Sequence, residues 1–420
     1  MTTTTHAGLD ERLAAWFASD PDAIAGSVEL LRDVREQAPV YEFESAHLVL
    51  RYAEAKAVIR DNRVQMSRAD VPKGNRARAG RSRLTPEQQR AHDEVMAFEG
   101  LQLSRTDPPQ HDRLRRIAHR AFTPARIAAM RDTIQRYTDE LLEPLAAQDV
   151  ADLRHMAYRL PLMIVSDLLG VPEADRDTIH AWTAKIARNK GGTIVAEPVM
   201  EARSAIGSFN DYVTDLVEEH RRSAAPVSDL VGALIDAEAD ERLSTEELAA
   251  MFVVLLFGGH ETTTNLISLG MLELLRRPEQ WRRLTDDPEL ARPATEELLR
   301  FTSPVQWLQR VAVEDIELAG AEIRAGDNVY AMLAAANRDP EVFPDPDRLD
   351  VTRPEGKKHI ALGFGPYFCL GASLARMEGA VAFETIARRY PGIELATDEV
   401  RYEGSALLRT LTELPVRLNQ

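Results

Sequence analysis

Ala361-Leu-Gly-Phe-Gly-Pro-Tyr-Phe-Cys-Leu-Gly371 holds the single cysteine of the chain, Cys369, in a loop rich in glycine. A helical pattern follows at once over residues 372–389. We therefore expect the sulfur at or near a helix N-terminus, where the helix dipole and unpaired backbone N–H groups favour the thiolate. Such a thiolate suits a soft metal centre such as haem iron. The alternative for a lone cysteine is a buried, inert thiol. The nearby glycines favour a ligand, because a backbone without Cβ atoms can approach a flat group.

Composition excludes several classes of protein. The 420 residues are 44% hydrophobic and 28% charged, which is typical of a globular protein and not of a disordered or membrane-embedded chain. The formal net charge of −16 repels phosphate backbones, so we expect no nucleic-acid partner. One cysteine cannot form an internal disulfide or a cysteine-rich zinc site, which favours a cytoplasmic location. The apolar run over residues 251–257 is too short to cross a membrane.

Helical periodicity dominates the chain. Strand-like pieces are few and lie at residues 40–43 and 48–50, in fragments over 311–333, and near 411–418. The fold class predicted is mainly α with small β-sheets, after a flexible tail over residues 1–10. The predicted helices cover residues 12–17, 24–36, 131–145, 153–169, 204–220, 245–275 and 373–389.

The longest predicted helix starts at a capping box, Ser244-Thr-Glu-Glu247, and continues to about Arg276. Its centre, Phe257-Gly-Gly-His-Glu-Thr-Thr-Thr-Asn265, breaks the rules for a helix of this kind. Each glycine costs about 1 kcal/mol relative to alanine, and the carboxylate of Glu261 is expensive in apolar surroundings unless it is used or paired. Such a conflict tends to mark function. A packing kink with a satisfied carboxylate is the alternative.

These two stretches resemble the haem-binding loop and the oxygen-activation motif of the cytochrome P-450 family, the haem-thiolate monooxygenases. The resemblance implies haem b (iron protoporphyrin IX) as cofactor and Cys369 as the axial ligand, held in a loop that includes Gly363 and Gly371. It also implies proton delivery by Glu261 and assistance to oxygen activation by Thr262.

The loop departs from the family pattern at two positions. Leu362 stands where the family usually has phenylalanine, and Tyr367 stands where it usually has a basic residue. A tyrosine hydroxyl could still hydrogen-bond a haem propionate, although without a charge.

Glu297 and Arg300 lie one helical turn apart, a spacing usually found in surface ion pairs. The resemblance implies instead a buried structural pair, joined by Arg348 as the third member. It also implies propionate contacts, for each of which a surface salt bridge is the alternative. These contacts are His111, Arg115, Arg310 and His359.

The helix that carries His111 also has a basic stripe of Arg113, Arg116 and Arg120. In the family that the chain resembles, acidic ferredoxins or flavodoxins deliver electrons on the side of the haem that bears the cysteine. We therefore expect the stripe to contribute to docking such a partner, and a solvated helix face is the alternative.

The resemblance covers nearly the whole chain and implies a single haem-thiolate domain over residues 1–420, a monomer that takes electrons from separate redox partners. The expected reaction is O2-dependent oxidation of a small organic substrate. Oxidative coupling, peroxide-driven oxidation and a non-catalytic haem sensor are the alternatives. Trp307 suggests a planar substrate, and the basic residues over 73–83 suggest an acidic group on it. The expected substrate pocket comprises the 70–103 region, Phe257, Gly258, residues 305–308 with Trp307 and Leu308, Leu407 and Leu408.

Overall fold

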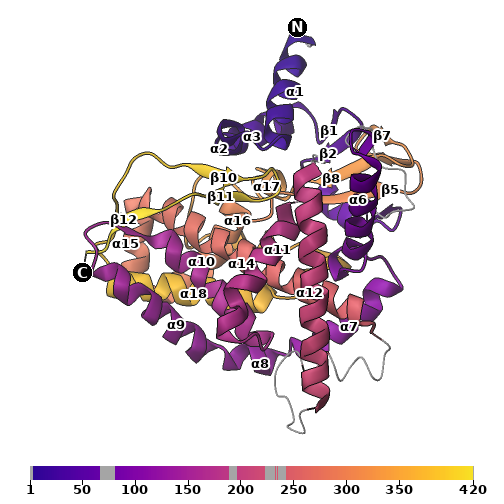
Figure 1. Cartoon of the computed structure of the whole chain (residues 1–420). Helices are drawn as coiled ribbons and strands as arrows, with labels where there is room; N and C mark the ends of the chain where they lie inside the picture. Colours follow the sequence, from indigo (N-terminus) through magenta and orange to yellow (C-terminus); the bar gives the residue numbers. More distant parts are fainter. Residues whose placement is uncertain are drawn as a thin grey trace. The chain divides into compact units, whose positions relative to one another are not determined.

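The computed structural model describes residues 3–66, 81–188, 196–222, 232, 234 and 243–419 (Figure 1). It divides into two compact units. Unit 1 comprises Met1–Val64, Ala128–Pro161 and Glu261–Gln420, and unit 2 comprises Gln65–Ile127 and Leu162–His260. Because each unit combines segments that are distant in sequence, neither is a contiguous domain, and the single-domain organisation stays a prediction.

Helices make up most of unit 1, as the periodicity predicts. The first helix begins at Thr3, and the flexible tail expected over residues 1–10 stays a prediction. The α-helices are α1 (Thr3–Phe17), α2 (Pro21–Ala25), α3 (Ser27–Gln37), α4 (Tyr52–Arg60), α9 (Arg131–Ala146), α15 (Pro278–Asp286), α16 (Ala291–Thr302), α17 (Leu333–Ala336) and α18 (Ala372–Arg389). The 3-10 helices are η3 (Pro288–Leu290), η4 (Pro354–Lys358) and η5 (Gly365–Tyr367).

The largest sheet has the strand order β1-β2-β8-β5-β3. Its members are β1 (Val40–Phe43), β2 (Ala46–Val49), β8 (Asn328–Ala331), β5 (Leu308–Ala312) and β3 (Val64–Gln65). Strand β2 runs parallel to β8, whereas β1–β2 and β5–β8 are antiparallel. The sheet therefore joins the two strand-forming regions predicted from the sequence.

Three further sheets are small and antiparallel. They are β6 (Ile316–Leu318) with β7 (Ala321–Ile323), β10 (Tyr402–Gly404) with β11 (Arg409–Leu411), and β12 (Pro415–Arg417) between β4 (Ala151–Asp152) and β9 (Glu394–Leu395). The fold class is confirmed: the chain is mainly α with small sheets.

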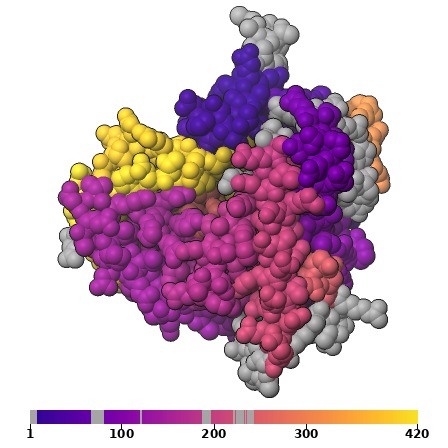
Figure 2. All heavy atoms as spheres, viewed as in Figure 1, coloured from indigo at the N-terminus to yellow at the C-terminus, as the bar shows by residue number. Residues whose placement is uncertain are grey.

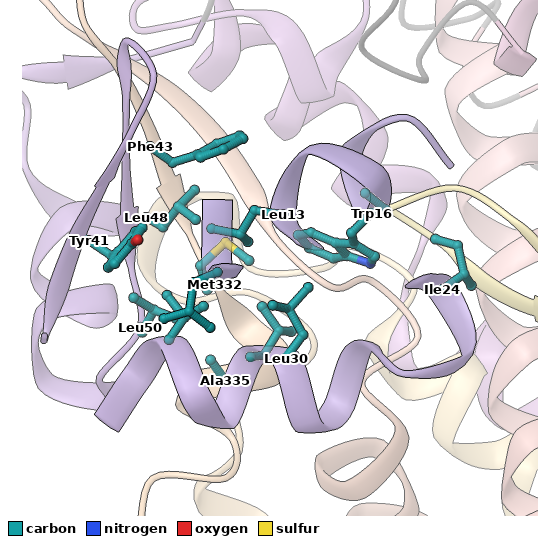
Figure 3. Packing of buried hydrophobic residues seen from close by; sticks show 14 residues of the cluster. Leu13, Trp16, Ile24, Leu30, Tyr41, Phe43, Leu48, Leu50, Met332 and Ala335 are labelled. Atoms are coloured by element: carbon teal, nitrogen blue, oxygen red, sulfur yellow. The ribbon is translucent and has the colours of Figure 1, made fainter. Parts of the chain in front are cut away.

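One hydrophobic cluster in unit 1 joins the first helices to the main sheet (Figure 3). Leu13 and Trp16 from α1 meet Leu30 from α3, and Leu48 and Met332 complete the centre. All five side chains are buried, so the N-terminal helices are part of the core and not an appendage.

Unit 2 is built from helices packed on one another. Helix α12 packs against both α6 and α11, and Figure 2 shows α6 and α12 side by side at the surface. The ring of Trp182 on α11 lies 6.3 Å from the rings of Phe209 and Tyr212 on α12. The elements of unit 2 are α6 (Pro86–Glu99), η1 (Leu103–Arg105), α7 (Gln110–Ala121), η2 (Glu173–Asp175), α11 (Arg176–Arg188) and α12 (Ala196–Arg222).

Three helices cross the division between the units in sequence: α8 (Pro124–Ala129), α10 (Leu153–Leu168) and α14 (Thr245–Leu275). The capping box that starts α14 is present, because Ser244 Oγ accepts from Glu247 N at 3.1 Å and Ser244 N donates to Glu247 Oε2 at 3.2 Å. The 31 residues of α14 are the helix predicted from the sequence. Among the described residues, every helix is too short or too polar to cross a membrane.

Candidate active site

The cysteine loop is closed by its own backbone hydrogen bonds. Cys369 N donates to Leu362 O at 2.8 Å, and Phe368 N donates to Gly365 O at 3.1 Å. Gly363 has φ +75°, and a Cβ there would lie 3.1 Å from the carbonyl oxygen of Tyr367. Gly365 has φ +67°. Both positions therefore require glycine for the backbone conformation that presents Cys369.

The third loop glycine has a different role. Gly371 has an ordinary φ of −84° and is the N-cap of α18, so no side chain caps the first turn of that helix. A Cβ at Gly371 would meet nothing within 4 Å, which means that open space lies beside the loop. Cys369 is half-buried three residues before α18 begins. The placement near a helix N-terminus, predicted from the sequence, is confirmed.

Arg310 and Tyr367 come together although they are far apart in sequence. The guanidinium carbon of Arg310 lies 4.8 Å from the centre of the Tyr367 ring, a cation–π contact. Arg310 is 3% exposed, and its Nη1 donates to Gln309 O at 2.8 Å. Strand β5 thus brings the buried cation of Arg310 to Tyr367. Tyr367 stands at the position where the family usually has a basic residue.

His359 does not fit the propionate role expected of it. Its Nε2 lies 3.1 Å from Glu296 Oε2, and its Nδ1 accepts from Ala361 N at 3.2 Å. Because the backbone N–H fixes Nδ1 as an acceptor, Nε2 carries the proton and donates to Glu296. Both ring nitrogens are engaged within the protein, so His359 positions the chain before the loop instead of binding a carboxylate of the cofactor.

Glu296 is the centre of this contact. Burial by itself raises the pKa of Glu296, but hydrogen bonds from His359 and Arg376 outweigh it and lower that pKa to about 2. Arg376 Nε donates to Glu296 Oε1 at 2.6 Å, from α18. The carboxylate therefore ties α16 to α18 and to the segment before the cysteine loop. No sequence motif pointed to Glu296 or to Arg376.

The predicted pair of Glu297 and Arg300 is buried, with both side chains 0% exposed. Arg300 Nε and Nη2 donate to the two carboxylate oxygens at 2.7 and 2.8 Å, a bidentate pair. The third member is wrong, however. Arg348 is exposed and pairs with Asp350, whereas Arg353 Nε donates to Glu297 Oε1 at 3.0 Å.

Arg353 was missed because the sequence analysis assigned Arg348 alone by its match to the family pattern. Its own surroundings explain why it, and not Arg348, is buried. Arg353 donates to the carbonyl oxygens of Pro344, Asp345 and Arg348, at 2.6 to 3.1 Å. Every guanidinium nitrogen therefore has an acceptor, which is what the burial of a cation requires.

The two glycines at the centre of α14 serve different purposes. A Cβ at Gly259 would lie 3.0 Å from Val165 Cγ2, so this glycine permits close packing on α10 within unit 2. Gly258 is exposed, and a Cβ there would meet nothing within 4 Å. Phe257 beside it is half-buried. Of the two glycines, Gly258 and not Gly259 borders open space, as a residue in a pocket wall must.

Glu261 and Thr262 open the part of α14 that belongs to unit 1. Both side chains are half-buried, while residues 263–272 that follow are buried. The acid and the alcohol are therefore accessible at the point where the helix passes into the core. A carboxylic acid and a hydroxyl in this position can exchange protons with a ligand or with water.

Helix α7 in unit 2 presents His111 and Arg115 on one face, as predicted. His111 is 1% exposed, and its Nδ1 lies 3.2 Å from Asp112 Oδ1. Burial lowers the pKa of His111, in spite of the opposing effect of Asp112. A neutral histidine can contribute a hydrogen bond to a carboxylate, while the charge on this face comes from the half-buried Arg115.

The basic stripe on α7 is less accessible than the sequence suggests. Arg113 forms an ion pair with Glu247, which also accepts from Gln110 Nε2 at 3.2 Å. Arg116 is exposed. The side chain of Arg120 lies outside the described residues. Among the described arginines of the stripe, Arg116 is thus the one best exposed for a partner.

The expected substrate-pocket residues of unit 1 fall into two groups. Trp307 packs with the core cluster, 4.9 Å from the ring of Tyr330 and 6.5 Å from that of Phe17. This packing removes the basis for a planar substrate drawn from Trp307. Leu308, Leu407 and Leu408 are half-buried, and the hydrogen bond from Gln306 N to Leu407 O, 2.9 Å, joins their two segments. Residues 67–80 lie outside the described residues, with most of the basic stretch.

These residues fit a haem. The cysteine is presented at a helix N-terminus with open space beside Gly371, as a thiolate ligand to iron requires. A buried guanidinium, that of Arg310, stands in the same unit and suits a carboxylate-bearing group.

The comparisons with known proteins agree with this geometry. Residues 194–409 match the family model described as "Cytochrome P450". The chain is 34% identical to the polyketide biosynthesis cytochrome P450 PksS of Bacillus subtilis, over 92% of this chain and 94% of that protein. It is 40% identical to the vitamin D(3) 25-hydroxylase of Pseudonocardia autotrophica, over 79% and 81%.

A solved structure gives the same result for the fold. The structure of P450BioI in complex with an acyl carrier protein that carries hexadec-9Z-enoic acid superposes with a TM-score of 0.84. The identity is 31%, and the match covers 94% of this chain and 99% of that chain.

Proposed function

The chain belongs to the cytochrome P450 family, and on that premise we propose that the Cys369 sulfur is the axial ligand to the haem iron. The enzyme is a haem-thiolate monooxygenase that uses O2, an organic substrate and electrons from redox partners. The observation that carries the assignment of Cys369 is the loop: two glycines with positive φ hold the sulfur just before α18. When bound, the haem supplies the oxidising chemistry.

Cys369 is proposed to act as a thiolate. Cys369 lies three residues before α18, whose first turn has no side-chain cap, so backbone N–H groups and the positive end of the helix dipole are at that end of the helix. Such donors favour the thiolate form of a cysteine. The backbone bond from Cys369 N to Leu362 O holds the backbone of the loop at this residue.

Glu261 and Thr262 are proposed to move protons. The Thr262 hydroxyl would donate a hydrogen bond to oxygen at the reacting position, and Glu261 would return the proton from solvent. Their half-burial supports this role, because each side chain is accessible while the residues after them are in the core. A relay needs this combination of access to water and shelter from bulk solvent.

Arg310 and Tyr367 of unit 1 would hold propionate of haem b. Within unit 2, the face of α7 that carries His111 and Arg115 stays a predicted propionate contact. Arg310 and Tyr367 are already in contact, which supports their action as one site. The arginines contribute charge, whereas Tyr367 and the neutral His111 contribute hydrogen bonds. His359 is left out of this set because Glu296 and Ala361 occupy its ring.

The substrate is proposed to be a small organic molecule, with Leu308, Leu407 and Leu408 of unit 1 as pocket residues. Phe257 and Gly258 of unit 2 stay predicted pocket residues. The enzyme is proposed to work as a cytoplasmic monomer with a ferredoxin or flavodoxin. Arg116 is the described arginine best exposed for that partner. Arg116→Glu should slow reduction and weaken its salt dependence, while Arg136→Glu, which also reverses an exposed arginine, should not. Equal reduction rates in wild type and Arg116→Glu would contradict the docking site.

The ligand assignment is tested by the absorption spectrum of the reduced protein with carbon monoxide. We expect a Soret band displaced far to the red, as thiolate ligation gives, and its loss in Cys369→Ser. An ordinary histidine-type band in the wild type would refute thiolate ligation.

The proton relay is tested by Thr262→Ala with a substrate found by its effect on the spin state. We expect electron consumption to continue while more of it ends as hydrogen peroxide. Thr264→Ala is the matched control, since it removes a nearby buried hydroxyl that has no partner among the described residues. Equal peroxide yields in the two variants would contradict the role of Thr262.

A further inference from the structure

Unit 1 contains a small cavity that the proposed active site does not use. Its volume is about 10 Å³, which is close to the space that one water molecule needs. It lies between α3, the C-terminal end of α16, α17 and β11. Two uncharged polar residues in its wall, Thr302 and Gln306, direct their own donors to backbone carbonyls.

Four arginines line this cavity: Arg32, Arg35, Arg338 and Arg409. None of the other lining residues is acidic. The chain has a net charge of −16, so we would not expect four cationic side chains to line one cavity by chance. Burial of like charges costs free energy unless an anion compensates them.

The acidic groups around the cavity compensate only part of this charge. Arg338 Nη1 donates to Asp347 Oδ1 at 2.5 Å, and Arg32 Nε lies 3.7 Å from Asp33, which also pairs with Arg12. Among the described residues, neither Arg35 nor Arg409 has a carboxylate within salt-bridge distance.

Arg35 and Arg409 also have donors to spare. Arg35 is 6% exposed and donates through Nη1 to Ala335 O at 2.8 Å. Arg409 donates through Nη2 to Ala25 O at 3.4 Å, and its Nε is buried without an acceptor among the described residues. Burial lowers the pKa of Arg35 although Asp339, Asp347 and Glu36 oppose it. The guanidiniums of Arg35 and Arg409 therefore have donors available for an anion.

We propose that this cavity binds one small monovalent inorganic anion of the size of chloride or bromide, held by Arg35 and Arg409 with charge from Arg338. The volume excludes a larger ligand without rearrangement. The site is independent of the haem and of the reaction.

The anion would connect elements that are separated in sequence, because Arg35 is on α3 and Arg409 is on β11. Gln306 in the cavity wall already joins two of the neighbouring segments. Gln306 N donates to Leu407 O at 2.9 Å, and Ala334 N donates to Gln306 O at 3.0 Å. Binding would therefore stabilise the folded state and hold the segments that carry Leu308 and Leu407. Anything that binds only the folded state raises the unfolding temperature with its concentration.

The test uses the purified full-length holoenzyme in sodium gluconate, whose anion is too large for the cavity. Gluconate is replaced by bromide at constant ionic strength while thermal unfolding is followed. We expect a saturable rise in Tm, and an anomalous bromine peak beside Arg35 and Arg409 in crystals soaked in bromide. Phosphate, which exceeds the cavity, should produce a smaller rise.

Arg409→Gln should abolish both the saturable rise and the peak, and Arg136→Gln on the exposed face of α9 should preserve the rise. Should Arg409→Gln fail to fold, Arg409→Lys keeps the charge but removes the Nε donor, and we expect weaker saturation by bromide. Absence of a bromine peak in the wild-type cavity would overturn the proposal. So would an identical bromide response in wild type and in the Arg409 variants.

Discussion

Glu297 on α16 and Glu378 on α18 are both buried carboxyl groups of unit 1, yet their surroundings are opposite. Glu297 accepts from Arg300, Arg353 and the backbone N of Asp350. Glu378 is 2% exposed, and its Oε2 has no hydrogen-bond partner among the described residues. Burial alone raises the pKa of Glu378 well above its ordinary value.

The contrast shows that a fold can accommodate a buried carboxyl group in two ways. The carboxyl group of Glu297 is hydrogen-bonded by two guanidiniums. Glu378 is kept neutral because proton uptake costs less than an unpaired charge in the core. The first arrangement makes the carboxylate a structural link, whereas the second leaves a group whose removal should cost little.

The largest expected effect comes from breaking the network at its centre. Glu297→Ala should destabilise the protein by about 3–5 kcal/mol, because it leaves two buried guanidiniums without their counterion. Denaturant unfolding of the holoenzyme measures this change. Glu289→Ala removes an exposed acid from η3 and should cost no more than about 0.5 kcal/mol. Similar losses in the two variants would contradict the contrast.

A second test separates Arg353, which contacts Glu297, from Arg348, which was predicted to do so. Arg353→Ala should cost about 3 kcal/mol because it removes a buried partner of Glu297, whereas exposed Arg348→Ala should change stability by no more than about 0.5 kcal/mol. The denaturant midpoints of the two variants show which arginine is the structural partner of Glu297. A larger loss for Arg348→Ala would restore the original assignment.

Glu296 extends the comparison to pH. Its folded-state pKa of about 2 lies below the ordinary value of 4.5, so its contribution is present above pH 4.5 and is lost as pH falls toward 2. With allowance for solvent screening, we expect up to about 2 kcal/mol from this group. Glu296→Gln should flatten the stability curve in this window. An unchanged slope between pH 4.5 and 3 in the variant would argue against the ion pair.

The smallest effect is expected at Glu378, and its sign is opposite. Because the folded-state pKa is raised, the contribution of Glu378 to stability is present below pH 4.5 and is lost as pH rises. Glu378→Met should therefore be neutral or stabilise the protein by about 1 kcal/mol at pH 7. Thermal unfolding at pH 5 and pH 7 checks this, and a marked destabilisation at pH 7 would show that the carboxyl has a role that the contacts do not reveal.

The sequence alone predicted the mainly α fold class and the positions of the principal helices. Its signals are local: the capping box at Ser244, the period of the apolar residues, and the glycine loop around Cys369 act over a few residues. The pair of Glu297 and Arg300 was also visible, since one helical turn joins the two residues. These features needed only the geometry of a single element.

Only the tertiary structure decided which distant side chains meet. Arg353 and not Arg348 reaches Glu297, His359 turns to Glu296, and Trp307 joins the core around Phe17. The four arginines around the small cavity come from α3, β11 and the chain between them. Such contacts depend on how separated elements pack, and the alternation of apolar and polar residues within one element carries no information about its partner.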